Sequence, residues 1–139
     1  MSPANILVAD DGKVMRLVLS TKLKEVGYSV TEAEDGHEVL QAVSEQSFDL
    51  IVLDIHMPGM NGIEALKELR KTHSRIQLPV IMATANDEEE DVVEAFELGA
   101  NDFVSKPINF PILLARLDTQ LRLKRATEEL EKLAGGSEG

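Results

Sequence analysis

The sequence predicts an α/β fold, a doubly wound five-stranded parallel sheet with an extended C-terminal helix. Short apolar runs rich in β-branched residues recur along the chain, and stretches with apolar residues at helical spacing separate them. This alternation is typical of parallel strands joined by crossover helices, and such connections should be right-handed. The 139 residues, 43% of them hydrophobic, suffice for one domain with a real core and are too few for two.

Five apolar runs are expected to form the strands of this sheet. In chain order they cover residues 6–9, 28–33, 50–53, 79–83 and 102–104. The first, third and fourth runs are almost continuously apolar, which indicates strands that are buried on both faces. We expect the second and fifth runs to flank the other three.

Local signals mark the ends of the helices between these strands. Gly27 follows the apolar stripe of the first helix and is suited to a left-handed C-terminal stop, and Gly99 should end the fourth helix. Pro111 falls in the first turn of the fifth, where a missing N–H costs nothing. Capping-box pairs predict three helix starts: Asp35 with Glu38, Asn61 with Glu64, and Asp87 with Glu90.

The stretch 113–133 is longer than a crossover helix needs, and it carries two apolar stripes. The first is suited to docking on a sheet, and the second falls at a–d–a–d heptad positions: Leu113, Leu114, Leu117 and Leu121, then Leu123, Ala126, Leu130 and Leu133. We therefore place the globular domain at 4–122, and at 123–139 a helical extension and flexible linker toward an absent output domain or a truncation end. Two interpretations stay open for the extension, a helix that pairs with a partner helix and a solvated, frayed helix.

Composition excludes several classes of function. The 14 basic and 25 acidic residues give a net charge of −11, which would repel a nucleic-acid backbone. The absence of cysteine excludes disulfides, thiolate metal sites and cysteine nucleophiles. Residues 1–9 have no basic region and are too short for a signal sequence or a membrane span, so we expect a cytoplasmic protein without membrane insertion.

Polar residues follow the apolar runs, at the edge of a doubly wound sheet where ligands bind: Asp10, Asp11, Asp54, Thr84 and Lys106. Each alone has an ordinary structural explanation, such as a helix cap. Together, carboxylates about 4 Å apart would repel by roughly 4 kcal/mol per pair at an effective dielectric near 20. Lysine supplies one compensating charge, and an oxygen-only donor set is typical of a hard divalent cation, most simply Mg²⁺.

Such a site suits phosphoryl transfer, in which the protein mainly positions groups and neutralises charge. Asp54 is the best candidate nucleophile, because it stands alone at the end of the most buried strand and a carboxylate can form an acyl phosphate. Asp10 and Asp11 would then hold the metal. Lys106 and Thr84 would supply a point charge and a rotatable donor to the phosphate oxygens.

Four motifs of the chain resemble the signature of response-regulator receiver domains, in the order and spacing of that family over about residues 4–122. They are Ile6-Leu7-Val8-Ala9-Asp10-Asp11, the run Asp-x-x-Met-Pro-x-Met-x-Gly from Asp54 to Gly62, Ala83-Thr84-Ala85, and Lys106-Pro107. The resemblance implies a flavodoxin-like, CheY-like sheet with strand order 2-1-3-4-5. It also implies a phosphorylation-activated switch in a two-component system.

The resemblance implies a role for each matching residue. Asp54 would accept a phosphoryl group from a sensor histidine kinase or phosphotransfer protein. Asp10, Asp11, Asp54 and the backbone carbonyl of His56 would bind Mg²⁺. Lys106 would pair with the phosphate, and its peptide bond to Pro107 would be cis.

The same resemblance implies how the state is relayed. Thr84 would move toward the phosphate and Phe103 would rotate inward, which changes the face of the fourth helix, fifth strand and fifth helix. That face, with the C-terminal helix, would then form a homodimer or bind an output domain or effector. His56 and Asn86 would tune hydrolysis of the acyl phosphate, because the domain assists its own phosphotransfer and dephosphorylation without being a turnover enzyme.

Two other classes of protein make different demands on the sequence. A phosphatase of the haloacid-dehalogenase type uses Asp-x-Asp, usually after the first strand, whereas here Asp54-Ile55-His56 follows the third. A flavin- or dinucleotide-binding module needs a glycine- or hydroxyl-rich loop after the first strand, where this chain has Asp10-Asp11. Both classes are therefore weaker alternatives.

Overall fold

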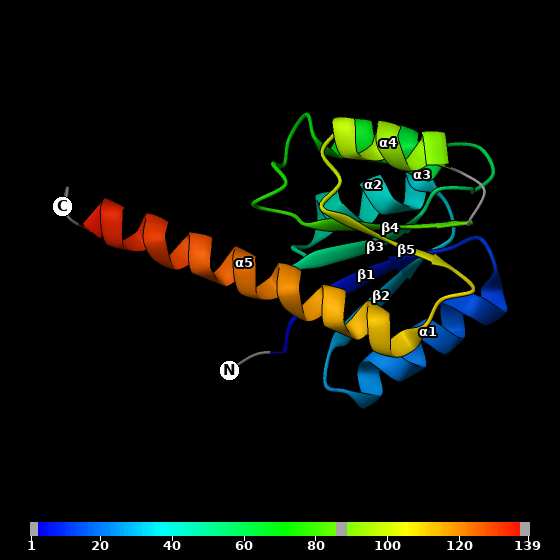
Figure 1. Ribbon diagram of the computed structural model, residues 1–139, viewed down its shortest axis with the longest axis horizontal. Helices are drawn as coiled ribbons and strands as arrows, with labels where there is room; N and C mark the ends of the chain where they lie inside the picture. Colours follow the sequence, from blue (N-terminus) through cyan, green and yellow to red (C-terminus); the bar gives the residue numbers. More distant parts are fainter. Residues whose placement is uncertain (1–2, 86–88, 137–139) are drawn as a thin grey trace.

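The computed structural model describes residues 3–85 and 89–136, which form a three-layered α/β domain with one long protruding helix (Figure 1). The elements alternate strictly between strand and helix. They are β1 (Asn5–Ala9), α1 (Lys13–Glu25), β2 (Ser29–Ala33), α2 (Gly36–Glu45), β3 (Leu50–Asp54), α3 (Gly62–Leu69), β4 (Val80–Ala85), α4 (Glu89–Glu97), β5 (Asp102–Lys106) and α5 (Phe110–Gly136).

The five strands form one parallel sheet in the order β2-β1-β3-β4-β5, which confirms the predicted fold class and strand order. Every residue of β3 is buried, whereas β2 and β5 lie at the two edges and are partly exposed. The predicted division into central and flanking strands is therefore confirmed. The last strand runs on to Lys106, two residues beyond the predicted run, and so carries the lysine to its carboxyl end.

Two hydrophobic cores hold the helices against opposite faces of the sheet. One core packs α2, α3 and α4 through residues such as Val39, Leu66 and Ala95. The other packs α1 and α5 through residues such as Leu23 and Leu117, and Figure 1 shows these two helices on the side of the sheet opposite α2, α3 and α4. Because both faces are covered, the carboxyl ends of the strands are left as the open rim.

The helix ends agree with most of the predicted signals. Gly27 and Gly99 have φ values of 103° and 106°, as left-handed stops require. Asn61 and Glu64 form a complete capping box. Asp35 caps α2, but the Glu38 carboxylate accepts from the Glu34 N–H, so the reciprocal half of this predicted box is wrong. The third predicted pair involves Asp87, which lies outside the described residues.

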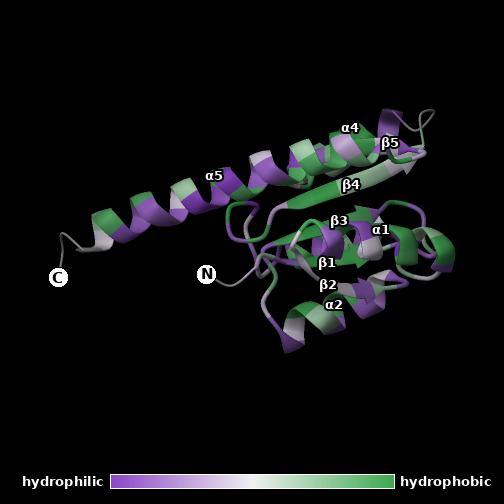
Figure 2. Cartoon of the chain, turned by 90° about the horizontal axis from the view of Figure 1, so that it is seen from below, coloured by the Kyte–Doolittle hydropathy of each residue, from purple (hydrophilic) through white to green (hydrophobic). Residues whose placement is uncertain are grey.

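Helix α5 begins on the sheet and ends away from it. The Asn109 side chain caps its first turn by accepting from the Ile112 N–H at 3.1 Å. Leu113, Leu117 and Leu121 are buried, after which the helix leaves the body of the domain (Figures 1 and 2). It continues to Gly136, so that most of the predicted extension and linker, 123–139, is helical. Within the described ranges, no helix is long and apolar enough to cross a membrane.

Candidate functional site

Three carboxylates meet at the open rim of the sheet. Asp54 is the last residue of β3, and Asp10 and Asp11 follow β1, which pairs with β3. One carboxylate oxygen from each lies within 4.8 Å of the other two. Asp10 and Asp54 are each only 3% exposed, whereas Asp11 faces solvent. The parallel register thus converts two distant sequence positions into one acidic cluster.

Lys106 brings a cation to this cluster from the edge strand β5. Its Nζ lies 2.7 Å from Asp54 Oδ2 and 3.2 Å from Asp10 Oδ2. The peptide bond between Lys106 and Pro107 is cis. The lysine therefore contacts both buried carboxylates at once.

Backbone amides hold the other oxygen of each buried carboxylate. The Gly12 N–H donates to Asp10 Oδ1 at 2.8 Å, and the His56 N–H donates to Asp54 Oδ1 at 3.2 Å. Arg16, which the sequence analysis did not single out, donates from Nη1 to the Asp10 backbone carbonyl at 2.7 Å. These bonds fix the orientation of both carboxylates before any ligand binds.

Burial and charge act in opposite directions on these groups. Burial raises the pKa of Asp54, and the hydrogen bond and charge of Lys106 only partly oppose it. Burial acts to lower the pKa of Lys106, but Asp54 and Asp10 together outweigh it and raise that pKa. Lys106 thus neutralises only part of the repulsion between the clustered carboxylates. A further positive charge would lower the electrostatic energy of the site.

The donor set fits a magnesium ion. Three carboxylates converge while Lys106 supplies a single charge, so the rim keeps an excess of negative charge. Oxygen ligands at this spacing are what a small, hard divalent cation prefers. The exposed carboxylate of Asp11 gives such an ion a side that is open to water and to a phosphate oxygen.

Thr84 and Phe103, the two predicted switch residues, lie on the neighbouring strands β4 and β5; Thr84 is next to last in β4, close to the rim, and Phe103 is three residues before Lys106 in β5. Thr84 is 2% exposed, and its Oγ1 donates to the Ala85 carbonyl at 3.2 Å. The Phe103 ring lies between α4 and α5, in edge-to-face contact with Phe96 at 6.1 Å between centroids, and 5.8 Å from the Arg116 guanidinium carbon. Phe103 therefore sits on the face through which the resemblance implies signal output.

His56 and Asn86 are the two residues predicted to tune hydrolysis of the acyl phosphate. The His56 side chain is 62% exposed, and its Nε2 lies 3.5 Å from Asp91 Oδ2 in the first turn of α4. This places the ring across the gap between the phosphoacceptor loop and α4. Asn86 lies outside the described residues.

Gly62 is a site residue whose role the sequence did not reveal. A Cβ at this position would lie 2.1 Å from the Asp54 carbonyl oxygen, and the Gly62 N–H donates to the Ile55 carbonyl at 2.9 Å. Only a residue without a side chain lets the start of α3 approach the phosphoacceptor loop this closely. Its place in the Met-Pro-x-Met-x-Gly run was the available signal.

Comparison with known families decides the class of this site. A family model described as the response regulator receiver domain matches residues 6–118. The chain belongs to this family. Receiver domains are the phosphorylation switches of two-component signalling, so this is a signalling protein, and membership removes the phosphatase and flavin-module alternatives.

Two curated relatives place this receiver domain within longer proteins. It is 43% identical over 122 residues to the Bacillus subtilis protein named uncharacterized transcriptional regulatory protein YkoG, covering 88% of this chain and 53% of that protein. It is 42% identical over 132 residues to transcriptional regulatory protein CpxR of Klebsiella pneumoniae, covering 95% and 55%. The chain thus spans about half the length of the curated relatives it matches.

A solved structure shows the same architecture for the receiver domain. The receiver domain of the Francisella response regulator 1452 superposes with a TM-score of 0.78 at 36% identity, covering 86% of this chain and 97% of that one. The likeness therefore extends over nearly all of the solved receiver and leaves a part of this chain unmatched.

Proposed function

We propose that this receiver domain accepts a phosphoryl group on Asp54 from a phosphohistidine of a sensor histidine kinase or phosphotransfer protein. The observation that carries the proposal is the contact of Lys106 Nζ with both Asp54 and Asp10, at 2.7 and 3.2 Å. This contact joins an oriented carboxylate nucleophile to a cation that can neutralise phosphate oxygens. The raised pKa of Asp54 is compatible with this role, because a nucleophile must be less well solvated than a surface carboxylate.

A magnesium ion would be held by Asp10, Asp11, Asp54 and the backbone carbonyl of His56, and it would neutralise charge on the phosphoryl oxygens. The residues of the chain perform the transfer. An Asp54 carboxylate oxygen attacks phosphorus, a P–O bond forms, and the P–N bond breaks with its electron pair returning to the donor imidazole. Lys106 then exchanges its contact with the carboxylate for one with the phosphate.

Hydrolysis of the acyl phosphate returns the domain to its resting state, and we propose that the domain assists this step itself. Water must approach the phosphorus past residues at the rim. His56 stands there, with its ring near Asp91, and Asn86 is the second proposed tuning residue. Side chains at these two positions would set the access of water and thus the phosphoryl lifetime.

Relay of the signal would use the face formed by α4, β5 and α5. Thr84 would donate to the phosphate and vacate its resting position, which allows Phe103 to turn inward from between Phe96 and Arg116. Phosphate shifts the balance only because it interacts better with one of the two arrangements. The altered face would then bind a second copy of the domain or an output partner.

The surface charges of this face support pairing between two copies. The first turn of α4 contains Glu89, Glu90 and Asp91, whereas α5 presents Arg116 and, further along, Arg122. A two-fold arrangement can bring the acidic helix of one copy to the basic residues of the other. We propose a dimer that forms on phosphorylation.

We propose that residues 4–122 act as the switch and that the segment 123–139 leads toward an output domain. The curated relatives, named transcriptional regulatory proteins, are about twice as long as the matched region, which supports an output domain beyond the receiver. In this arrangement α5 is the physical connection between the switching face and the effector.

Phosphorylation with acetyl phosphate and Mg²⁺ tests the assignment. The wild-type chain should gain one phosphoryl group, measured by intact mass, and hydroxylamine should remove it. Asp54→Asn should abolish the gain, whereas the matched control Asp118→Asn, on the exposed face of α5, should leave it intact. Labelling that persists in Asp54→Asn would overturn the assignment.

Sedimentation with and without a beryllofluoride phosphate mimic tests the dimer separately. We expect the mimic to raise the dimer fraction and Arg116→Ala to reduce that effect. A sedimentation coefficient that does not respond to beryllofluoride at any protein concentration would contradict dimerisation through this face and leave phosphorylation of Asp54 intact.

A further inference from the structure

The Arg16 guanidinium connects α1 to two other segments of the chain. Its Nη1 donates to the Asp10 carbonyl at 2.7 Å, and its Nε donates to Glu32 Oε1, on the edge strand β2, at 3.2 Å. The Arg16 side chain is only 13% exposed, although it carries a charge. The Arg16–Glu32 pair therefore ties the loop after β1 to both α1 and β2.

The carbonyl that Arg16 contacts belongs to the peptide bond between Asp10 and Asp11. A peptide group is planar, so a hydrogen bond to its carbonyl restrains the whole plane and the direction in which the next residue leaves it. Asp10 and Asp11 are the two residues of this loop that contribute to the acidic cluster. Arg16 thus acts on the covalent link between two of the carboxylates that would hold the metal.

The Asp11 carboxylate depends on the backbone for its position. It is exposed and makes no hydrogen bond or ion pair with any residue in 3–85 or 89–136. Asp10 is held much more fully, because its N–H donates to the Ala33 carbonyl at 3.1 Å and its Oδ1 accepts from the Gly12 N–H at 2.8 Å. The Arg16 bond extends this restraint to the start of Asp11.

Building on the magnesium site proposed above, we propose that Arg16 is a positioning residue that makes this site selective for Mg²⁺ over Ca²⁺. Mg²⁺ requires short, nearly octahedral ligand geometry, whereas Ca²⁺ accepts longer and more irregular arrangements. A restrained peptide plane keeps the carboxylates of Asp10 and Asp11 in one narrow arrangement. Loosening that plane should therefore weaken the binding of Mg²⁺ more than that of Ca²⁺.

The charge of Arg16 and its hydrogen bonds act in opposite directions on a bound cation. A guanidinium near a metal site repels the ion, so an effect of charge alone would make loss of Arg16 strengthen Mg²⁺ binding. Loss of the hydrogen bond to Asp10 should weaken it. Lysine separates the two effects, because it keeps the charge but places it on a flexible stem without the planar fork that serves Asp10 and Glu32 together.

Titration with Mg²⁺ and with Ca²⁺ at constant ionic strength tests the inference, with the amide NMR signals of residues 10–12 as the readout and no phosphodonor present. Arg16→Lys should raise the Kd for Mg²⁺ by about tenfold, the lower end of the loss that is typical when a residue orienting a metal ligand is changed. The Kd for Ca²⁺ should rise much less, and Arg16→Gln should act in the same direction. An unchanged ratio of the two constants in Arg16→Lys, or tighter Mg²⁺ binding by Arg16→Gln, would overturn the proposal.

The partner carboxylate provides a second variant that leaves the core untouched. Glu32 is 35% exposed, and Glu32→Gln should weaken Mg²⁺ binding in the same direction by a smaller factor. It should cause no further loss in the Arg16→Lys protein, because the two side chains act as one unit. Additive losses would mean that Glu32 acts through its own charge, and they would contradict a shared role of the pair.

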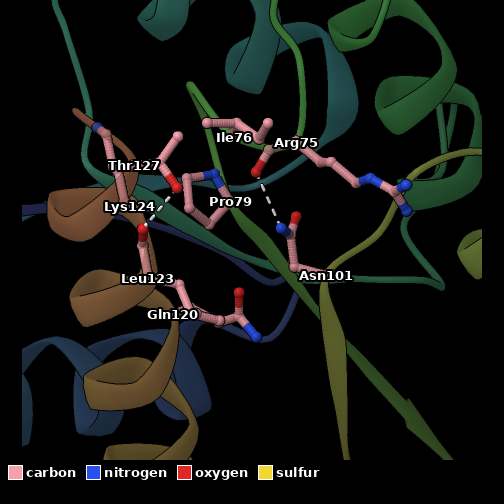
Figure 3. A pocket seen from close by; sticks show the side chains of 8 residues that line it. All are labelled: Arg75, Ile76, Pro79, Asn101, Gln120, Leu123, Lys124 and Thr127. Carbon is pink, nitrogen blue, oxygen red and sulfur yellow. Dashed lines mark hydrogen bonds between the residues drawn. The ribbon is translucent and has the colours of Figure 1, made fainter. Parts of the chain in front are cut away.

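Arg75→Lys is the matched control, because Arg75 lies in the loop before β4, at the other end of the sheet. Its backbone carbonyl accepts from the Asn101 amide, and Figure 3 shows its guanidinium pointing away from Asn101. Both metal constants should stay at their wild-type values in this variant. The amide signals outside residues 10–12 verify that each variant is folded.

The same variants separate failure of this inference from failure of the proposed function. With acetyl phosphate, Arg16→Lys should need more Mg²⁺ for half-maximal phosphorylation of Asp54 and should recover the wild-type rate at saturating Mg²⁺. A rate that stays low at saturation would contradict a role limited to holding the metal loop. A wild-type chain whose signals ignore Mg²⁺ would overturn the magnesium site and this inference together, whereas an unchanged Mg²⁺/Ca²⁺ ratio with normal phosphorylation would overturn this inference alone.

Discussion

Lys106 Nζ lies 2.7 Å from Asp54 Oδ2, a contact that spans 52 residues of sequence and joins the edge strand β5 to the central strand β3. The same ammonium reaches Asp10 at the end of β1. One cation therefore offsets two buried carboxylates, while a third, Asp11, adds negative charge from the solvent side. This imbalance leads to the first two predictions.

When Mg²⁺ is absent, removing the positive charge at the rim should destabilise the fold, whereas removing a negative charge should stabilise it. Lys106→Met should lower the free energy of unfolding by about 1–3 kcal/mol, less than a fully buried pair would lose, because the lysine is 30% exposed. Asp11→Asn should raise it by up to about 1 kcal/mol, since water screens an exposed charge. Urea denaturation in EDTA measures both. A stabilising Lys106→Met would contradict the charge balance described above.

Magnesium should stabilise the folded chain through the same cluster. A ligand at a hundredfold excess over its Kd adds about 2.7 kcal/mol to the free energy of unfolding. We expect a rising melting temperature as Mg²⁺ is titrated into the wild-type chain, and little or no rise for Asp11→Asn. The second acidic group, at Glu34, Asp35 and Glu38, provides the control, because Glu34→Gln should leave the Mg²⁺ response unchanged. An equal response in Asp11→Asn would place the ion elsewhere.

A methyl group at residue 62 should disturb the phosphoacceptor loop. Gly62→Ala would set a Cβ 2.1 Å from the Asp54 carbonyl oxygen, so we expect a loss of about 3 kcal/mol or more and slower phosphorylation. Gly135→Ala is the matched control, because nothing lies within 4 Å of its Cβ position. It should raise stability by at most about 1 kcal/mol. Similar unfolding midpoints for the two variants would show that α3 can shift away from the loop.

The single tyrosine gives a direct test of alkaline stability. Burial raises the pKa of Tyr28 above its ordinary value, with Asp118 adding to the effect and Arg125 opposing it. The stability that this group contributes is fully present below the unfolded pKa near 10 and is lost as pH rises through the folded pKa. Absorbance titration near 295 nm should show a higher midpoint in the folded chain than in urea.

Two variants check the cause of this shift. Tyr28→Phe should remove the tyrosine contribution to the fall in stability above pH 10, and Asp118→Asn should lower the folded midpoint. A folded midpoint equal to that in urea would mean that the tyrosine is as well solvated as in the unfolded chain.

Much of the fold could be predicted because its signals are local. Continuous apolar runs separated the central strands from the edge strands, and Gly27 and Gly99 marked helix ends through their own backbone preferences. Asn61 predicted the start of α3 because a capping box needs only four consecutive residues. The capping box predicted at Asp35 forms only in part, because the Glu38 carboxylate accepts a hydrogen bond from the neighbouring Glu34 N–H instead of the Asp35 N–H. Local patterns do not distinguish between two adjacent donors.

The sequence predicted which residues form the candidate site, but not the hydrogen bonds and close contacts that support them. Because ligands bind beyond the carboxyl ends of parallel strands, the sequence alone singles out Asp10, Asp11, Asp54, Thr84 and Lys106. The sequence did not predict the residues that hold these side chains in place. Arg16 and Gly62 act through backbone carbonyls, and no pattern of residue types reveals which carbonyl will lie within reach.

The sequence by itself therefore determined the class of fold, the edge of the sheet that carries the chemistry and the residues that compose it, because periodicity, capping and motif spacing depend on near neighbours. Only the tertiary structure decided the relations across long loops. These include the lysine shared by Asp54 and Asp10 and the bond from Arg70 to the Gly99 carbonyl. Such contacts depend on strand register and helix packing, which are set by the whole core at once.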